Sequence, residues 1–285
     1  MKPASPATAP GPRSARTDWP KHVVILAVVA VELFPLYMML QVSFKDNNGF
    51  VQQPWLPSHP STWQWENWVF GFKLIVPYLA NTAFVALGGT LASLGLAILG
   101  AYFFARYRMP GGHILWSLFL VLMLLPSVAN IVPLFLLLKS LSLLNTLWAL
   151  IIVGVAAGQV FNIFVLRNFI EELPKDLFEA AEIDGAGHLQ QIRHVVIPLS
   201  GPIIGTLAIL AFLQAWNEFL LPLIVLRDPS RFTLGVGLIY LDGEYVKQWG
   251  QIMAAYFIAA VPLIGIFLFT MRLFIRGLSA GAIKG

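Results

Sequence analysis

Six long apolar segments constrain this chain more than any other feature of its sequence. Each is long enough for an α-helix to cross the roughly 30 Å hydrocarbon core of a bilayer. We expect membrane spans at residues 22–44, 76–105, 114–138, 146–166, 202–226 and 252–275. The alternating pattern of β-barrel strands is absent. The predicted fold class is therefore an all-α membrane protein with six transmembrane helices.

The composition agrees with this prediction. Of the 285 residues, 58% are hydrophobic and 11% are charged, whereas a soluble domain usually has about a quarter charged residues. Cysteine is absent from the sequence, which excludes disulfides, thiolate catalysis and cysteine-ligated metal.

The lysines and arginines predict the orientation in the membrane. If the N-terminus is cytoplasmic, twelve of them fall in inside loops and six in outside loops. Cytoplasmic loops are the basic ones, so both termini are expected in the cytoplasm. The net charge of +4 then reflects topology, and no nucleic-acid partner is expected.

Composition shifts divide the chain into parts. Four tryptophans lie in the outer loop, where they indicate an aromatic belt at the membrane interface; a docking surface for an extracellular partner or a sugar-stacking site is the alternative. The predicted parts are a disordered proline-rich segment at 1–20, a first transmembrane helix and outer loop at 21–75, a transmembrane core at 76–276 and a cytoplasmic tail at 277–285.

One inside loop, residues 167–200, is acidic where the others are basic; we call it the coupling segment. Its carboxylates are Glu171, Glu172, Asp176, Glu179, Glu182 and Asp184. Pro174 suits the first turn of a helix. From there Leu177, Ala180, Ala181 and Asp184 share one helical face, and the alanines keep that face thin. Gly185 permits the backbone angles that end a helix.

A second short helix is expected after this glycine. Leu189, Ile192 and Val196 share its apolar face, and Pro198 ends it. The two helices form a rigid, L-shaped lever between two spans. An amphipathic helix on the inner membrane face is less consistent, because such helices favour basic residues. Six carboxylates beside a bilayer also disfavour a DNA-reading helix-turn-helix.

The coupling segment resembles the "EAA" loop of ATP-binding-cassette importer permeases. Glu179-Ala180-Ala181 is followed at the family spacing by Asp184-Gly185-Ala186, and then by Ile197-Pro198. The resemblance implies that this loop inserts into a cleft of a cytoplasmic ATPase. Ile192 stands where the carbohydrate branch commonly has phenylalanine, and it is expected to fill the ATPase pocket.

The resemblance extends over most of residues 22–285 and is specific to the maltose-type, six-span branch. It is carried by Trp216-Asn217-Glu218-Phe219, by Trp249-Gly250-Gln251 and by the tail from Arg276 to Gly285. It implies a sugar importer of the bacterial inner membrane, with a homologous second permease, two ATP-binding subunits and an extracellular or periplasmic solute-binding protein. The tail, with Gly281, Ala282 and Lys284, is expected to be extended and to reach the ATPase interface.

No catalytic residue, metal site or cofactor is expected. The chain lacks a G-x-x-x-x-G-K-[ST] phosphate loop, so ATP hydrolysis is assigned to a partner. The five histidines are scattered toward span ends and loops, which disfavours a membrane-embedded enzyme.

Polar residues inside spans are costly and often functional. The predicted translocation path is lined by Gln214, Trp216, Asn217 and Glu218; an interhelical hydrogen bond is the alternative role for Glu218. Glu32, Gln159 and Asn162 are further polar residues within spans; Gln159 and Asn162 are expected close to the cytoplasm, where water would hydrate them. A stand-alone secondary transporter remains the alternative function, with Glu32 or Glu218 in its ion-coupling site.

Overall fold

The computed structural model describes residues 19–107, 110–124, 130–244 and 248–282, and every element in these ranges is a helix. The predicted all-α membrane fold is confirmed. The α-helices are α1 (Trp19–Ser43), α2 (Asn47–Gln52), α3 (Trp65–Arg106), α4 (Gly112–Leu124), α5 (Ile131–Ser140), α6 (Leu147–Glu171), α7 (Lys175–Ile183), α8 (His188–Gln191), α9 (Ile197–Leu199), α10 (Gly201–Asn217), α11 (Leu220–Val225), α12 (Leu234–Glu244) and α13 (Trp249–Ala282). Pro60–Thr62 and Pro229–Arg231 form 3₁₀ turns, and Ile192–Val196 forms a π-turn.

Four helices in the described residues are long and apolar enough to cross a membrane, namely α1, α3, α6 and the Trp249–Leu268 part of α13. A fifth span results if the bent pair His188–Leu199 and Gly201–Asn217 is counted as one. The span expected at 114–138 is represented by two shorter apolar helices, α4 and α5. The span expected at 202–226 is interrupted at Glu218, between α10 and α11.

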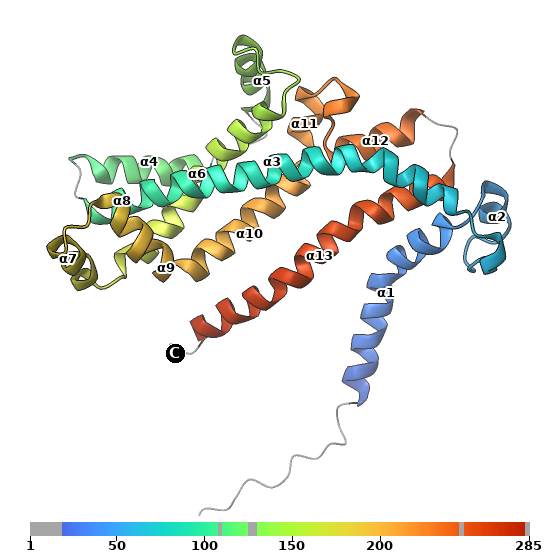
Figure 1. Ribbon diagram of the computed structural model, residues 1–285, viewed down its shortest axis with the longest axis horizontal. Coiled ribbons are helices and arrows are strands. Elements are labelled where there is room, and N and C mark those ends of the chain that lie inside the picture. The colour runs from blue at the N-terminus through green and yellow to red at the C-terminus, as the bar shows by residue number, and fades with distance from the viewer. Residues whose placement is uncertain (1–18, 108–109, 125–129, 245–247, 283–285) are drawn as a thin grey trace, which may run out of the picture.

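The central element of the fold is α3, which has 42 residues and runs along the length of the molecule (Figure 1). It packs against α6, α10 and α13. The helix starts at Trp65 rather than near residue 76, so the end of the predicted outer loop is helical. The segments α7 and α8 lie at one end of the molecule and α2 lies at the other (Figure 1).

Two apolar clusters line α3. One surrounds Ile75 and Ala86 and includes residues from α6, α11 and α12. The other surrounds Leu94 and Tyr102 at the far end of α3, and it includes Phe178 and Ile192 of the coupling segment. The second cluster therefore fastens the coupling segment to the transmembrane helices, since burial of apolar side chains is the main stabilising term.

The predicted outer loop is folded around a buried lysine. Lys45 donates hydrogen bonds from Nζ to the carbonyl oxygens of Gln53 and Leu56, and burial lowers its pKa. Beside it, the ring of Phe44 lies 4.5 Å from that of Trp63 and 5.4 Å from that of Trp68. These two tryptophans therefore pack against Phe44 in a local aromatic cluster; the role of the loop tryptophans as an interfacial belt remains a prediction.

The C-terminal end departs from the expectation of an extended tail. Helix α13 continues to Ala282, so the prediction is wrong for residues 277–282. Glycine weakens a helix by about 1 kcal/mol relative to alanine, but extension of an existing helix avoids the cost of nucleation. Lys284 lies outside the described residues.

Candidate functional site

The first helix of the coupling segment, α7, is attached to the body by a single buried side chain. Phe178 is 1% exposed, and its ring lies 4.1 Å from the guanidinium carbon of Arg106 at the end of α3. Arg106 also approaches Glu182, with 3.8 Å between Nη2 and Oε1. A cation over an aromatic face is attractive, so the arginine links both residues of α7 to α3.

Gly185 ends α7 as the sequence predicts. Its φ is +79°, a left-handed conformation that L-residues other than glycine adopt at a cost. The backbone N–H of Ala186 donates to the oxygen of Ala181 at 2.8 Å, and that of Gly185 donates to Glu182 at 3.0 Å. This pair of bonds is the Schellman motif, which satisfies the last carbonyls of a helix.

The second helix of the segment ends at Leu199, one residue after the predicted end at Pro198. Residues His188–Leu199 form one helical stretch through α8, the π-turn and α9. Pro198 lacks an N–H and cannot bond to the carbonyl four residues back; immediately before it, Ile197 N–H bonds to the oxygen of Ile192, as in a π-helix. The stretch then meets α10 at 84°. The turn is at Ser200, whose N–H donates to Val196 at 2.8 Å.

A buried glutamine joins the parts of this segment. Gln191 is 1% exposed, and its Oε1 accepts a 2.7 Å hydrogen bond from the hydroxyl of Tyr102 on α3. Its Nε2 donates to the carbonyl oxygen of Ala186 at 3.3 Å and lies 3.5 Å from Glu182 Oε1. One side chain thus connects α8, the turn after α7 and the transmembrane helix α3.

His188 extends this network toward the surface. Its Nδ1 lies 3.3 Å from the Tyr102 hydroxyl and 3.0 Å from the Tyr107 hydroxyl. Tyr102, Gln191 and Phe178 are not among the site residues predicted from the sequence. A buried polar cluster of this kind is strongly restrained when its members are satisfied.

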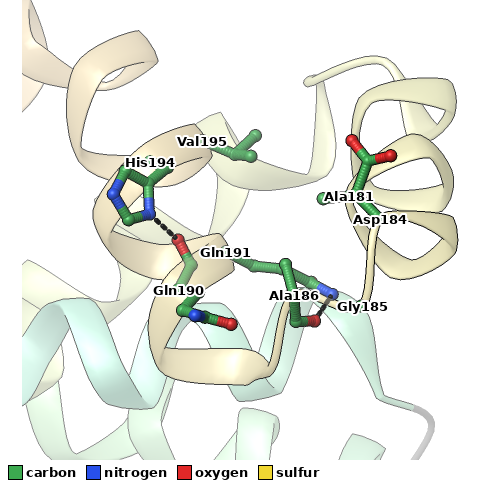
Figure 2. Close-up of a pocket in the computed structure, with 8 residues that line it drawn as sticks. All are labelled: Ala181, Asp184, Gly185, Ala186, Gln190, Gln191, His194 and Val195. Carbon is green, nitrogen blue, oxygen red and sulfur yellow. Dashed lines mark hydrogen bonds between the residues drawn. The ribbon is translucent and has the colours of Figure 1, made fainter.

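A recess separates α7 from the second helix of the coupling segment. It has a volume of about 290 Å³ and is lined by Ala181, Asp184, Gly185, Ala186, Gln190, Gln191, His194 and Val195. In Figure 2, Ala181 and Asp184 lie on one helix, while His194 and Val195 lie on the helix across the recess. Its floor is the Gly185–Ala186 turn. Of the predicted coupling residues, Ala181, Asp184, Gly185 and Ala186 therefore line this recess, whereas Glu179, Ala180, Ile192 and Pro198 lie outside it.

The outward surface of the segment carries both charge and apolar side chains. Glu179 and Ala180 are exposed, while Ile183 is 86% and Leu189 is 72% exposed. The predicted apolar face of the second helix is therefore only partly correct, because Leu189 points away from Ile192 and Val196, which are buried. Ile192 packs in the cluster around Tyr102, so it is not available to fill a partner's pocket.

A second concave feature, which we call the bundle cavity, lies between α3, α5, α6, α10 and α11 and has a volume of about 550 Å³. Gln214 and Glu218 line it, as the path prediction requires. Glu218 Oε1 accepts a hydrogen bond from Leu221 N–H at 3.1 Å. Trp216 is buried in the core cluster, and Asn217 is exposed with its amide bonded to Leu213 of its own helix; neither is part of the lining.

Of the remaining polar residues of the predicted spans, Asn162 also lines the bundle cavity, whereas Gln159 and Glu32 do not. Gln159 donates to the carbonyl oxygen of Ser93 at 3.0 Å, and Asn162 donates to the Ser93 hydroxyl at 3.0 Å. Both thus connect α6 to α3. Glu32 is exposed on α1, and α1 packs mainly against α13.

Comparison with known proteins matches this architecture to a family of membrane transport components. Residues 93–280 match the family described as "Binding-protein-dependent transport system inner membrane component". The chain is 32% identical over 282 residues to the sulfoquinovosyl glycerol transport system permease protein SmoH of Agrobacterium fabrum, covering 98% of this chain and 99% of the relative. It is 33% identical over 267 residues to the trehalose/maltose transport system permease protein MalG of Thermococcus litoralis, with coverage of 92% and 94%.

A solved structure has the same fold. It is a chain in the crystal structure of a bacterial ABC transporter involved in the import of the acidic polysaccharide alginate. The TM-score is 0.78 at 23% sequence identity, over 92% of this chain and 99% of that chain.

The helical bundle and the bent coupling segment thus define a multi-pass membrane transport subunit. The chain belongs to the family of binding-protein-dependent transport system inner membrane components. It is a permease subunit of an ABC transporter. Such subunits are non-catalytic, and ATP hydrolysis is carried out by a separate ATPase subunit.

Proposed function

We propose that this chain is the channel-forming subunit of an ATP-driven sugar importer, and that its coupling segment transmits the movements of the ATPase to the translocation path. The sugar assignment is supported by the names of its relatives, among them the trehalose/maltose permease of T. litoralis. The coupling assignment is supported by the geometry of the segment itself.

The observation that carries the proposal is the division of α7 into an anchored side and a free side. Phe178 holds the helix to α3, while Glu179, Ala180 and Ile183 face outward. A small residue beside an exposed carboxylate lets another protein approach closely and offers it a charge. Glu179 and Asp184 would face basic groups of an ATPase cleft, and such complementarity fixes the register of an interface.

The same segment is joined stiffly to the membrane helices. The Gly185 turn, the Gln191 network and the helix through Pro198 leave α7 fixed relative to α10. A displacement of α7 would therefore move α10 rather than be absorbed by a loop, which is how small shifts are passed on in domain movements. Ala181, Ala186 and Ile192 belong to this rigid segment. Ile192 lies on its buried side, in the cluster around Tyr102.

The proposed complex contains a homologous second permease, two ATP-binding subunits and an extracellular or periplasmic solute-binding protein. The distribution of Lys and Arg supports a position in the bacterial cytoplasmic membrane with both termini inside. Helix α1, whose most apolar window has no buried residue, presents a surface suited to lipid or to the second permease. The end of α13, with Gly281 and Ala282, and then Lys284 would lie near the ATPase.

The proposed path for the sugar follows the bundle cavity at the end of α10. Gln214 and Glu218 face it. Asn217 is exposed at the same helix end, and Trp216 would support the path from behind by packing in the core.

The test is affinity purification of this chain from its native membrane. We expect a second permease and an ATP-binding subunit to accompany it, and the ATP-binding subunit to be lost from a Glu179→Arg variant. The matched control is Glu172→Arg, an exposed carboxylate just before α7. Recovery of the chain alone, with uptake retained in vesicles that lack ATP, would overturn the proposal.

A further inference from the structure

Glu32 places a carboxylate in the middle of a transmembrane helix. Helix α1 runs from Trp19 to Ser43, so at 1.5 Å per residue Glu32 lies roughly 20 Å from the first residue of the helix and roughly 17 Å from the last. Long lysine and arginine side chains near helix ends reach the membrane interface. A glutamate side chain is too short to do so from this depth, so it needs a partner within the membrane.

The surroundings of Glu32 do not supply this partner. The residue is exposed, and the most apolar window of α1 has no buried residue. The buried residues of α1 are Gln41, Val42 and Ser43 at its C-terminal end, and from there α1 diverges from α13 (Figure 1). Within the part of the chain that the structure describes, Glu32 forms no hydrogen bond or ion pair.

A second polar group lies beside this carboxylate. Pro35 is inside α1 and has no N–H, so the carbonyl oxygen of Val31, four residues earlier, has no donor within the helix. Glu32 and Pro35 are three residues apart and share one face of α1. Both polar groups accept hydrogen bonds, and lipid chains donate none. The missing partner is therefore a group with several donors, such as the side chain of lysine or arginine.

A second copy of this chain would not provide such a group. Among the six apolar segments of the sequence, the only lysine or arginine is Arg272, which lies beyond the Trp249–Leu268 span of α13. Pairing of two α1 helices about a two-fold axis through this face would also bring two carboxylates together, and such repulsion is weakly screened away from water. The partner is therefore a different membrane protein. In the proposed complex, the second permease is the other subunit that is embedded in the membrane.

We propose that a transmembrane helix of the second permease packs along this face of α1 and carries a lysine or arginine at mid-membrane, which binds the Glu32 carboxylate and the Val31 carbonyl. The proposal rests on the two-permease complex proposed above and adds the contact that selects the partner. Polar groups inside an interface are best known for fixing register and partner choice. Glu32 is then a specificity residue of assembly, which keeps two copies of this chain from pairing through α1.

The contact is located by photo-crosslinking in native membranes. A benzophenone amino acid replaces Val29, which is 43% exposed and shares a face with Glu32. In the control protein it replaces Ala30, which is exposed and lies about 160° around the helix from Glu32.

We expect position 29 to cross-link to a span of the second permease with a lysine or arginine near its middle, identified by mass spectrometry, and position 30 to give clearly less product. Products with lipid alone, with another copy of this chain or with a span that has neither residue would overturn the proposal, as would equal yields from the two positions.

A substitution measures how much the contact contributes to assembly. Glu32→Leu removes the carboxylate and suits a side chain that faces lipid. We nevertheless expect recovery of the second permease with the tagged chain in detergent to fall about three- to fifteenfold, as for the loss of an interhelical polar contact, while membrane insertion is retained. The matched control is Glu66→Leu, an exposed carboxylate in the first turn of α3. Unchanged recovery for Glu32→Leu would contradict the proposal.

A charge exchange tests whether the two residues touch. Glu32→Lys should lower recovery of the second permease at least as much, because two cations then meet. Changing the cross-linked partner's cation to glutamate in the same complex should restore recovery to within about twofold of the wild type, because coupled residues compensate in a double-mutant cycle. Recovery that stays low in the exchanged pair would show that the two side chains are not in contact.

The wild-type chain separates failure of this contact from failure of the proposed function. If the tagged wild-type chain recovers no second permease, the two-permease importer itself is rejected. If it recovers the second permease while the label at position 29 reacts with lipid alone, the importer proposal stands and only the Glu32 contact is rejected.

Discussion

The hydroxyl of Tyr102 donates a 2.7 Å hydrogen bond to Oε1 of Gln191, across 89 residues of sequence. Both side chains are buried, and the bond joins the end of the central helix α3 to the second helix of the coupling segment. The bond also orients the amide of Gln191. With Oε1 held by Tyr102, Nε2 is directed at the carbonyl oxygen of Ala186 in the turn after α7.

Replacing Tyr102 with phenylalanine should loosen the coupling segment. The change leaves the buried oxygen of Gln191 without its donor, which typically costs about 1–3 kcal/mol. We expect faster protease cleavage near Gly185 and weaker sugar stimulation of ATP hydrolysis, while membrane insertion is retained. Tyr37→Phe is the matched control, because that hydroxyl on α1 bonds to the Trp55 carbonyl, and α2 lies at the opposite end of the molecule from α7 and α8 (Figure 1). Equal cleavage rates in the two variants would contradict the prediction.

Replacing Gly185 with valine should disrupt ATPase docking without affecting insertion. The backbone φ of +79° at this position is unfavourable for a β-branched residue, so the turn has to change and α7 has to reorient. Gly187→Val is the control in the same loop, because φ there is −71°. Co-purification of the ATP-binding subunit should be lost only in the first variant; normal recovery would show that the turn geometry is dispensable.

Replacing Gly250 with alanine should destabilise the fold at the start of α13. An added Cβ would lie 2.2 Å from the carbonyl oxygen of Lys45 and 2.3 Å from Nδ2 of Asn67, so backbone has to shift; overpacking of this kind typically costs about 1–3 kcal/mol. Gly265→Ala in the same helix meets nothing within 4 Å. The midpoint temperature of thermal unfolding in detergent should be lowered for Gly250→Ala only. Equal midpoints for the two variants would refute the close approach of Gly250 to Lys45 and Asn67.

Replacing Glu218 with alanine should alter transport while the complex still assembles. The change removes the acceptor for Leu221 N–H at the break between α10 and α11 and a charge from the bundle cavity. Thr206→Ala is the control on the same helix, since its hydroxyl bonds to Pro202 of that helix and it does not line the bundle cavity. Initial uptake rates in vesicles should change for Glu218→Ala and not for Thr206→Ala; unchanged uptake in both would assign Glu218 to packing.

The sequence predicted the parts of the site that depend on local rules. Gly185 ends α7 because the left-handed conformation is a local property, and the apolar segments predicted the helical membrane fold because spanning requires length and apolarity. Gln159 and Asn162 were expected to be hydrated, whereas both bond to Ser93 on the neighbouring helix α3.

Other features depend on contacts between distant parts of the chain. Gln191 is polar and lies in a charged segment, so its sequence context suggests a surface position, whereas its partner Tyr102 comes from another helix. The burial of Phe178 and Ile192 likewise depends on a distant part of the chain, because both pack against the end of α3. The helical turns of α13 beyond residue 276 were missed because three glycines in nine residues outweighed the existing helix that extends into them.

The bend at Ser200 also determines the direction in which a movement of the coupling segment is transmitted. The helices on its two sides meet at 84°, and the backbone bonds from Ser200 to Val196 and from Ile204 to Ser200 continue across the corner. If the angle at Ser200 stays fixed, α10 rotates together with the helix that precedes it. The far end of α10, where Gln214 and Glu218 are found, is then displaced sideways. For a given small rotation at Ser200, the displacement of that end grows in proportion to the length of α10, which is about 25 Å for its 17 residues.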